Sequence, residues 1–135
     1  MKRNPLGSGR DPVLLVVEDE AATQFVVAHF LEERGFEVVT AASASEARTV
    51  LAENASVNAV FSDVRLPDHN GYTLAQWIRQ EHPGLPIVLG SGGGLVPALI
   101  GQDFPFFLKP YNLCEVALFL HTMIRQSGSR RTNAA

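Results

Sequence analysis

The chain alternates short apolar runs with longer segments in which apolar residues recur every three or four positions. Unbroken runs of about five apolar residues are typical of strands buried on both faces of a sheet, whereas the longer spacing is typical of amphipathic helices. The runs predict strands over 13–17, 36–41, 58–62, 86–90 and 104–108. The helical spacing predicts helices over about 20–34, 43–53, 73–81 and 112–126.

Turn and cap residues mark the ends of the predicted helices. Gly35 is expected to end the first helix, because glycine readily adopts the conformation that closes many helices. Ser43 is expected to cap the second helix, with Glu46 completing a capping box, and Thr73 is expected to cap the third. The predicted apolar stripes are Phe25, Val26, His29, Phe30 and Leu31 in the first helix, and Leu113, Val116, Ala117, Leu120, Met123 and Ile124 in the last.

The segment 92–102 departs from this pattern, because it is rich in glycine and contains Pro97. Each glycine inside a helix destabilises it by about 1 kcal/mol relative to alanine, so we expect a short or irregular fourth helix here. Elsewhere strand and helix alternate along the whole chain. This alternation predicts an α/β fold, a doubly wound five-stranded parallel sheet with helices on both faces.

Composition is that of a single globular domain. The chain has 135 residues, of which 46% are hydrophobic and 19% charged, and its net charge of −3 gives no electrostatic basis for binding nucleic acid. No apolar run is long enough to cross a membrane, and the start lacks the apolar core of a signal peptide, so we expect a cytoplasmic protein without a membrane partner. We expect flexible tails over 1–11 and 127–135 around a domain at 12–126, with the single cysteine, Cys114, buried as a small hydrophobe.

Polar side chains follow four of the predicted strands, at the point where each strand ends. Glu18 and Asp19 follow the first strand, Asp63 the third, Ser91 the fourth and Lys109 the fifth. The carboxyl ends of parallel strands meet at one edge of the sheet, where the ligands of such folds gather. Three carboxylates, a hydroxyl and an ammonium suit a divalent cation together with a phosphoryl group. The pattern therefore predicts a phosphate-switched signalling domain.

These residues stand in motifs whose order resembles the receiver domain of two-component response regulators, over roughly residues 12–126. The resemblance implies the flavodoxin-like strand order 2-1-3-4-5. Many members of the family have Asp where this chain has Glu18, and Tyr is common where it has Phe106. The motifs are Val16-Val17-Glu18-Asp19-Glu20, Asp63-Val64-Arg65-Leu66-Pro67 with Gly71, Ser91-Gly92, and Lys109-Pro110-Tyr111.

The resemblance implies a role for each carboxylate at this edge. Asp63 would be the phosphoacceptor, since a carboxylate can attack phosphorus and form an acyl phosphate. Asp63 and Asp19 would coordinate Mg²⁺ directly, together with the backbone carbonyl of Arg65. Glu18 would act on the metal mostly through water.

The other implied roles concern the phosphoryl group and the signal. Lys109, in a cis peptide bond with Pro110, and Ser91 would contact phosphoryl oxygens. The N–H groups of Val64 and Gly92 would complete the cradle. Ser91 and Phe106 would then move together as a switch that alters the face formed by the fourth helix, fifth strand and fifth helix.

The implied function is that of a phosphorelay receiver that is not an enzyme. A histidine kinase or a histidine phosphotransfer protein would phosphorylate Asp63, and the signal would pass to an unknown downstream protein or to a homodimer formed through the switch face. The alternatives are a binding module that works without phosphorylation, the receiver piece of a hybrid histidine kinase, and a phosphatase or phosphotransferase. Haloacid-dehalogenase-like enzymes place a general acid two residues after the nucleophile, and Arg65 at that position argues against the last alternative.

Overall fold

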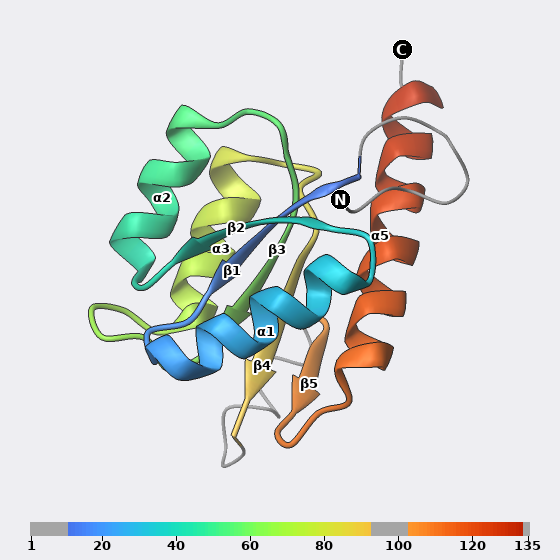
Figure 1. The fold of residues 1–135 in the computed structure, drawn as a ribbon. Coiled ribbons are helices and arrows are strands. Elements are labelled where there is room, and N and C mark those ends of the chain that lie inside the picture. Colours follow the sequence, from blue (N-terminus) through green and yellow to red (C-terminus); the bar gives the residue numbers. More distant parts are fainter. Residues whose placement is uncertain (1–10, 93–102, 134–135) are drawn as a thin grey trace.

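Five parallel strands form the centre of the fold, in the order β2-β1-β3-β4-β5 (Figure 1). The computed structural model describes residues 11–92 and 103–133. The expected strand order is confirmed. The strands are β1 (Val13–Val17), β2 (Glu37–Ala41), β3 (Val57–Asp63), β4 (Ile87–Ser91) and β5 (Phe106–Leu108).

Helices cover both faces of the sheet, as the doubly wound class requires (Figure 1). Helices α1 (Ala21–Glu33) and α5 (Leu113–Asn133) lie on one face, and α2 (Ala44–Glu53) and α3 (Gly71–Glu81) lie on the other. The predicted α/β class is confirmed. The short or irregular fourth helix would fall at 93–102, which lies outside the described residues, as do residues 1–10 of the predicted N-terminal tail.

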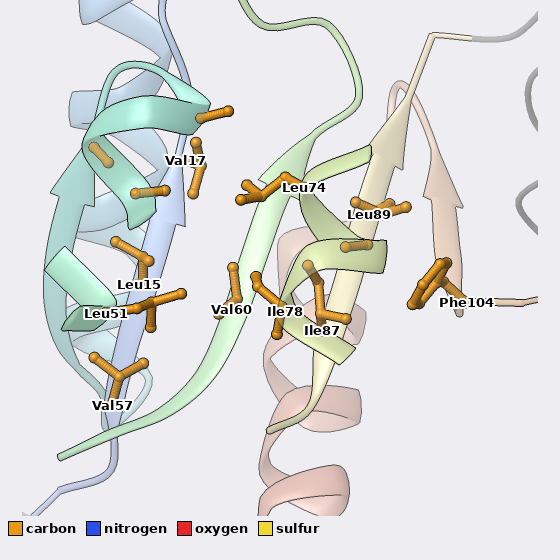
Figure 2. Close-up of a cluster of buried hydrophobic side chains, with 14 of the residues drawn as sticks. Leu15, Val17, Leu51, Val57, Val60, Leu74, Ile78, Ile87, Leu89 and Phe104 are labelled. Carbon is orange, nitrogen blue, oxygen red and sulfur yellow. The ribbon is translucent and has the colours of Figure 1, made fainter. Parts of the chain in front are cut away.

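Successive side chains of the central strands point into two separate cores. In β1, Leu15 and Val17 pack with α2 and α3, whereas Leu14 and Val16 pack with α1 and α5. Figure 2 shows the first core, where side chains of α2 and α3 meet those of β1, β3 and β4. Burial on both faces explains the unbroken apolar runs. Each fully buried aliphatic side chain stabilises the folded state by about 1.5–3 kcal/mol. The two cores together therefore stabilise the sheet whose carboxyl edge carries the polar residues.

Helix α1 buries only part of the predicted stripe: Leu31 is buried and Phe30 packs partly against the core, but Phe25 and Val26 do not. Val27 and Leu31 are buried, whereas Phe25 is 72% exposed and Val26 is 59% exposed. The segment carries apolar residues on most sides, so its periodicity is compatible with more than one stripe. Packing against the sheet and α5 selects the pair spaced by four residues.

The predicted cap of α2 is confirmed, but that of α3 was placed three residues too late. Ser43 Oγ accepts a hydrogen bond from the Glu46 N–H at 3.0 Å. In α3 the cap is Asn70, whose Oδ1 accepts from the Thr73 N–H at 2.7 Å. Thr73 is therefore a residue of the first turn. Both residue types cap helices well, and a tertiary contact of Gly71 with β3, described below, decides where the helix begins.

Helix α5 continues past its predicted end near Gln126 and reaches Asn133. Ser127 Oγ donates a hydrogen bond to the Gly84 carbonyl at 2.8 Å. This contact joins the helix to the loop after α3, at the point where glycine and serine in the sequence predicted a tail.

The predicted burial of the cysteine is wrong. Cys114 is exposed, and its Sγ accepts a hydrogen bond from the Arg34 guanidinium at 3.3 Å. The buried face of α5 is the predicted stripe, with Val116, Ala117 and Leu120 in the core. Cys114 lies off that stripe, because it is two positions before Val116, and residues two positions apart point to nearly opposite sides of a helix.

Candidate functional site

Three carboxylates meet at the carboxyl edge of the two central strands. Glu18 and Asp19 directly follow β1, and Asp63 is the last residue of β3, the strand paired with β1. One carboxylate oxygen from each of the three residues lies within 4.8 Å of the others. The structure thus brings together side chains that are 45 residues apart in the chain, as the parallel sheet predicted.

Glu18 is the buried member of this group, with a relative exposure of 6%. Burial raises the pKa of its carboxyl group, and the nearby Asp63 raises it further, while a hydrogen bond from the Glu20 N–H at 3.1 Å opposes the shift. The charged form of Glu18 is therefore penalised in the folded protein. A divalent cation with oxygen ligands would relieve both the burial and the repulsion, so the donor set fits such an ion.

Lys109 places a positive charge next to the same carboxylates. Its Nζ lies 3.0 Å from Asp63 Oδ2 and donates a hydrogen bond to it. The Lys109 N–H donates to the Ser91 carbonyl at 2.7 Å, which continues the pairing of β4 with β5. The Lys109–Pro110 peptide bond is cis, as the resemblance implied.

The expected phosphoryl donors lie along β4 and just after β3. Ser91 ends β4 and is buried, and Gly92 follows it and is exposed. The N–H of Val64 donates to the Gly90 carbonyl at 3.0 Å, within the continuation of the β3–β4 ladder. The Val64 N–H therefore already has an acceptor in the sheet, so a phosphoryl oxygen could accept from it only as a second acceptor, shared with the Gly90 carbonyl. The Arg65 N–H donates to Asp63 Oδ1 at 3.2 Å, so the loop after β3 orients the Asp63 carboxylate.

Gly71 allows helix α3 to begin directly beneath Asp63. Its N–H donates to the Val64 carbonyl at 2.7 Å. A Cβ at this position would lie 2.9 Å from the Val64 Cα and 3.1 Å from the Asp63 carbonyl carbon, and closer still to the carbonyl oxygen. Only glycine permits this approach. The motif therefore includes Gly71 for a steric reason that its spacing in the sequence did not reveal.

Two aromatic residues flank the site on β5 and after it. Phe106, the expected switch residue, is half-buried and packs against the core shared with α2 and α3. Tyr111 packs edge-to-face on Phe61, with ring centroids 5.5 Å apart, and its ring covers the backbone of Gly90. Burial raises the pKa of Tyr111 to about 12, and the charges of Asp63 and Glu18 contribute. Tyr111 stands in one of the motifs that carry the resemblance, but the sequence alone indicated no role for it.

The fold and this edge define a class of protein. A 2-1-3-4-5 parallel sheet that carries an acid pair after β1, an aspartate at the end of β3 and a lysine after β5 has the architecture of a phosphoacceptor receiver. The model of the response regulator receiver domain matches residues 14–100. The chain belongs to this family.

Relatives and solved structures agree with this assignment. The chain is 32% identical over 126 residues to the probable transcriptional regulatory protein TcrX of Mycobacterium tuberculosis, covering 89% of this chain and 53% of TcrX. It is 34% identical over 126 residues to the sensor kinase CckA of Brucella abortus, covering 88% of this chain and 13% of CckA. The chain thus spans about half or less of the length of these relatives.

Among solved structures, the non-phosphorylated HemR receiver domain from Leptospira biflexa superimposes with a TM-score of 0.72 at 30% identity, covering 84% of this chain and 94% of that one. The signal receiver domain of an HD domain-containing protein from Pseudomonas fluorescens gives a TM-score of 0.79 at 26% identity, covering 89% and 99%. In the part of the chain that the structure describes, no helix is both long and apolar enough to span a bilayer.

Proposed function

We propose that this receiver domain accepts a phosphoryl group on Asp63 from a phosphohistidine of a histidine kinase or a histidine phosphotransfer protein. The observation that supports this most directly is the position of Asp63. Its carboxylate lies 3.0 Å from the Lys109 ammonium and within 4.8 Å of oxygens from Glu18 and Asp19. Such an arrangement combines a nucleophile, a fixed cation and a group of metal ligands.

In the proposed step, one Asp63 carboxylate oxygen attacks the phosphorus of phosphohistidine. An O–P bond forms, the P–N bond breaks, and the electron pair leaves with the imidazole. Lys109 then balances the negative charge of the phosphoryl oxygens as a point cation. Ser91 and the N–H groups of Gly92 and Val64 are the further donors that we assign to those oxygens.

The metal in this proposal is Mg²⁺, which Asp19, Asp63 and the backbone carbonyl of Arg65 would hold, with Glu18 acting through water. When bound, Mg²⁺ neutralises charge on the transferring group. Glu18 and Asp19 also repel Asp63 in the absence of a cation, by roughly 4 kcal/mol for a close pair at an effective dielectric of 20. The acid pair therefore makes phosphorylation dependent on the ion.

Incubation with acetyl phosphate and Mg²⁺ tests the proposal. The protein should gain one phosphoryl group, detected as a mass increase, and lose it when the metal is chelated during the reaction. Asp63→Asn should abolish labelling. Asp103→Asn is the matched control, because it removes an acid outside the site. Labelling that persists in Asp63→Asn, or no labelling of the native chain at millimolar donor, would contradict the proposal and favour a phosphorylation-independent binding module.

The surface that would carry the signal includes β5 and α5. Leu108 is 53% exposed, Leu118 is 67% exposed and Phe119 is 37% exposed. The ring of Phe119 packs edge-to-face on Phe107, with centroids 5.8 Å apart, and so joins α5 to β5. We propose that Phe106 and Ser91 couple phosphorylation to this surface, which would bind a downstream protein or a second copy of the chain. The domain would act in the cytoplasm, as a switch without turnover of its own.

A second candidate is a receiver within a hybrid histidine kinase. The match to a sensor kinase, of which the chain covers 13%, favours this reading. Phosphotransfer profiling against candidate kinases separates the two, because an intramolecular receiver takes its phosphoryl group preferentially from the kinase to which it is joined.

A further inference from the structure

Asp68 ties the loop after β3 to the start of helix α2. Its Oδ1 accepts a hydrogen bond from the Ala44 N–H at 3.0 Å, and its Oδ2 accepts from the Ser45 N–H at 2.8 Å. These are two of the backbone N–H groups that a helix leaves without partners in its first turn. Ser43 Oγ satisfies a third, at Glu46. A side chain 23 residues further along the chain thus completes the cap of α2.

The end of β2, three residues before the first N–H that Asp68 binds, contacts the backbone of Glu18. The Glu18 N–H donates to the Ala41 carbonyl at 2.9 Å, and Gln24 Nε2 donates to both the Glu18 carbonyl, at 2.9 Å, and the Ala41 carbonyl, at 3.3 Å. The segment from Ala41 to Ser45 therefore touches Glu18 on one side and Asp68 on the other. Through these hydrogen bonds the segment connects the end of β1, which precedes the acid pair, with the loop after β3.

The loop that Asp68 holds is the one that carries the proposed metal-binding carbonyl of Arg65. The loop has no regular secondary structure between β3 and α3. At its ends it is fixed by the Val64–Gly71 hydrogen bond, and between them by Leu66, which packs partly against the core. Asp68 supplies the polar contact between the middle of the loop and a neighbouring element.

We propose that Asp68 is a positioning residue for the metal site. By tying the loop after β3 to the first turn of α2, it would fix the Arg65 carbonyl relative to the Glu18–Asp19 pair, whose backbone is held by the end of β2. The inference rests on the proposed function. Asp68 does not touch the ion or the phosphoryl group in this scheme. Partners that orient metal ligands typically change metal affinity by about 10–100-fold when they are removed.

Calorimetric titration with Mg²⁺, alongside thermal unfolding without metal, tests the proposal. Asp68→Ala should weaken Mg²⁺ binding by about tenfold. Ser43→Ala is the matched control, because it removes a cap from the same turn of α2 and leaves the loop after β3 untouched. It should lower the Tm while the Kd for Mg²⁺ stays within about twofold of the native value. Asp68→Asn, which keeps an oxygen acceptor but no charge, should recover part of the affinity lost in Asp68→Ala.

Two results would overturn the positioning role while leaving the proposed function intact. The first is a native chain that binds Mg²⁺ with a Kd that Asp68→Ala changes no more than Ser43→Ala does. The other is an equal loss in Asp68→Asn and Asp68→Ala, because charge alone would then explain the effect. If Asp68→Ala fails to fold, the comparison of Asp68→Asn with Ser43→Ala decides in the same way. A native chain that neither binds Mg²⁺ nor is labelled by acetyl phosphate would overturn both proposals.

Discussion

Replacing Gly71 with alanine tests how closely helix α3 must approach Asp63, the proposed phosphoacceptor. The φ angle of Gly71 is not positive, so the substitution introduces no backbone strain of its own, and the effect comes from space alone. The new Cβ would lie 2.9 Å from the Val64 Cα and closer to the Asp63 carbonyl oxygen. Ordinary contacts of a Cβ begin near 3.4 Å. These neighbours are backbone atoms that cannot rotate away, so the helix and the end of β3 must separate.

Overpacking of this kind typically costs about 1–3 kcal/mol, and the rigidity of the backbone places Gly71→Ala at the upper end. Alanine returns at most about 1 kcal/mol through its higher helix propensity. We therefore expect a net loss of about 2 kcal/mol in the free energy of unfolding, which corresponds to a decrease in Tm of about 5–10 °C. Because Asp63, a proposed ligand of Mg²⁺, must itself move, the increase in Tm that we expect on adding Mg²⁺ should also shrink.

Urea unfolding and thermal unfolding, each with and without Mg²⁺, measure both effects. Gly84→Ala is the control: its φ of +91° is unfavourable for alanine, but the Cβ meets nothing within 4 Å and the site is remote. The control should lose about 1–2 kcal/mol and keep the full metal response. If Gly71→Ala keeps the native stability and the native response to Mg²⁺, the close approach of α3 does not position Asp63.

Three other substitutions give distinct outcomes. Glu18→Gln should raise the free energy of unfolding at pH 7 without metal and reduce the response to Mg²⁺. Because folding raises the pKa of Glu18, the cost of burying its charge grows as the pH rises above about 4.5, so the gain in stability should vanish in acid. A gain in stability that does not depend on pH would refute this role of Glu18. Gly90→Ala places a Cβ 3.0 Å from the Tyr111 ring, so we expect it to lower the free energy of unfolding in urea by about 1 kcal/mol. In a chain that already carries Tyr111→Ala, Gly90→Ala should cause no such loss, and additive losses would refute the contact. His121→Ala removes a ring stacked on Phe36, with centroids 4.1 Å apart, and a hydrogen bond to the Arg34 carbonyl. The free energy of unfolding should fall by about 1–3 kcal/mol while the response to Mg²⁺ stays unchanged. A weakened response to Mg²⁺ would show that α5 influences the site.

Much of the fold and of the candidate site could be predicted from the sequence, because their signals are local. Strands buried on both faces need unbroken apolar runs, and the cap of α2 needs Ser43 directly before the helix. Parallel strands then place every residue that follows a strand at the same edge. Glu18, Asp63 and Lys109 could be grouped for this reason, and the structure does bring them together.

Features that depend on contact between distant segments could not be predicted in this way. Helix α1 has apolar residues on several sides, and only packing against the sheet and α5 leaves Phe25 exposed and Val27 buried. Similarly, Asp68 looks like an ordinary turn residue in the sequence, yet its carboxylate completes the cap of a helix that lies earlier in the chain. Periodicity along the chain thus determined which segments form strands and helices and which edge gathers the polar groups. Which side chains meet across those elements was decided by tertiary packing, because the spacing of residues along the chain does not specify which distant segments come into contact.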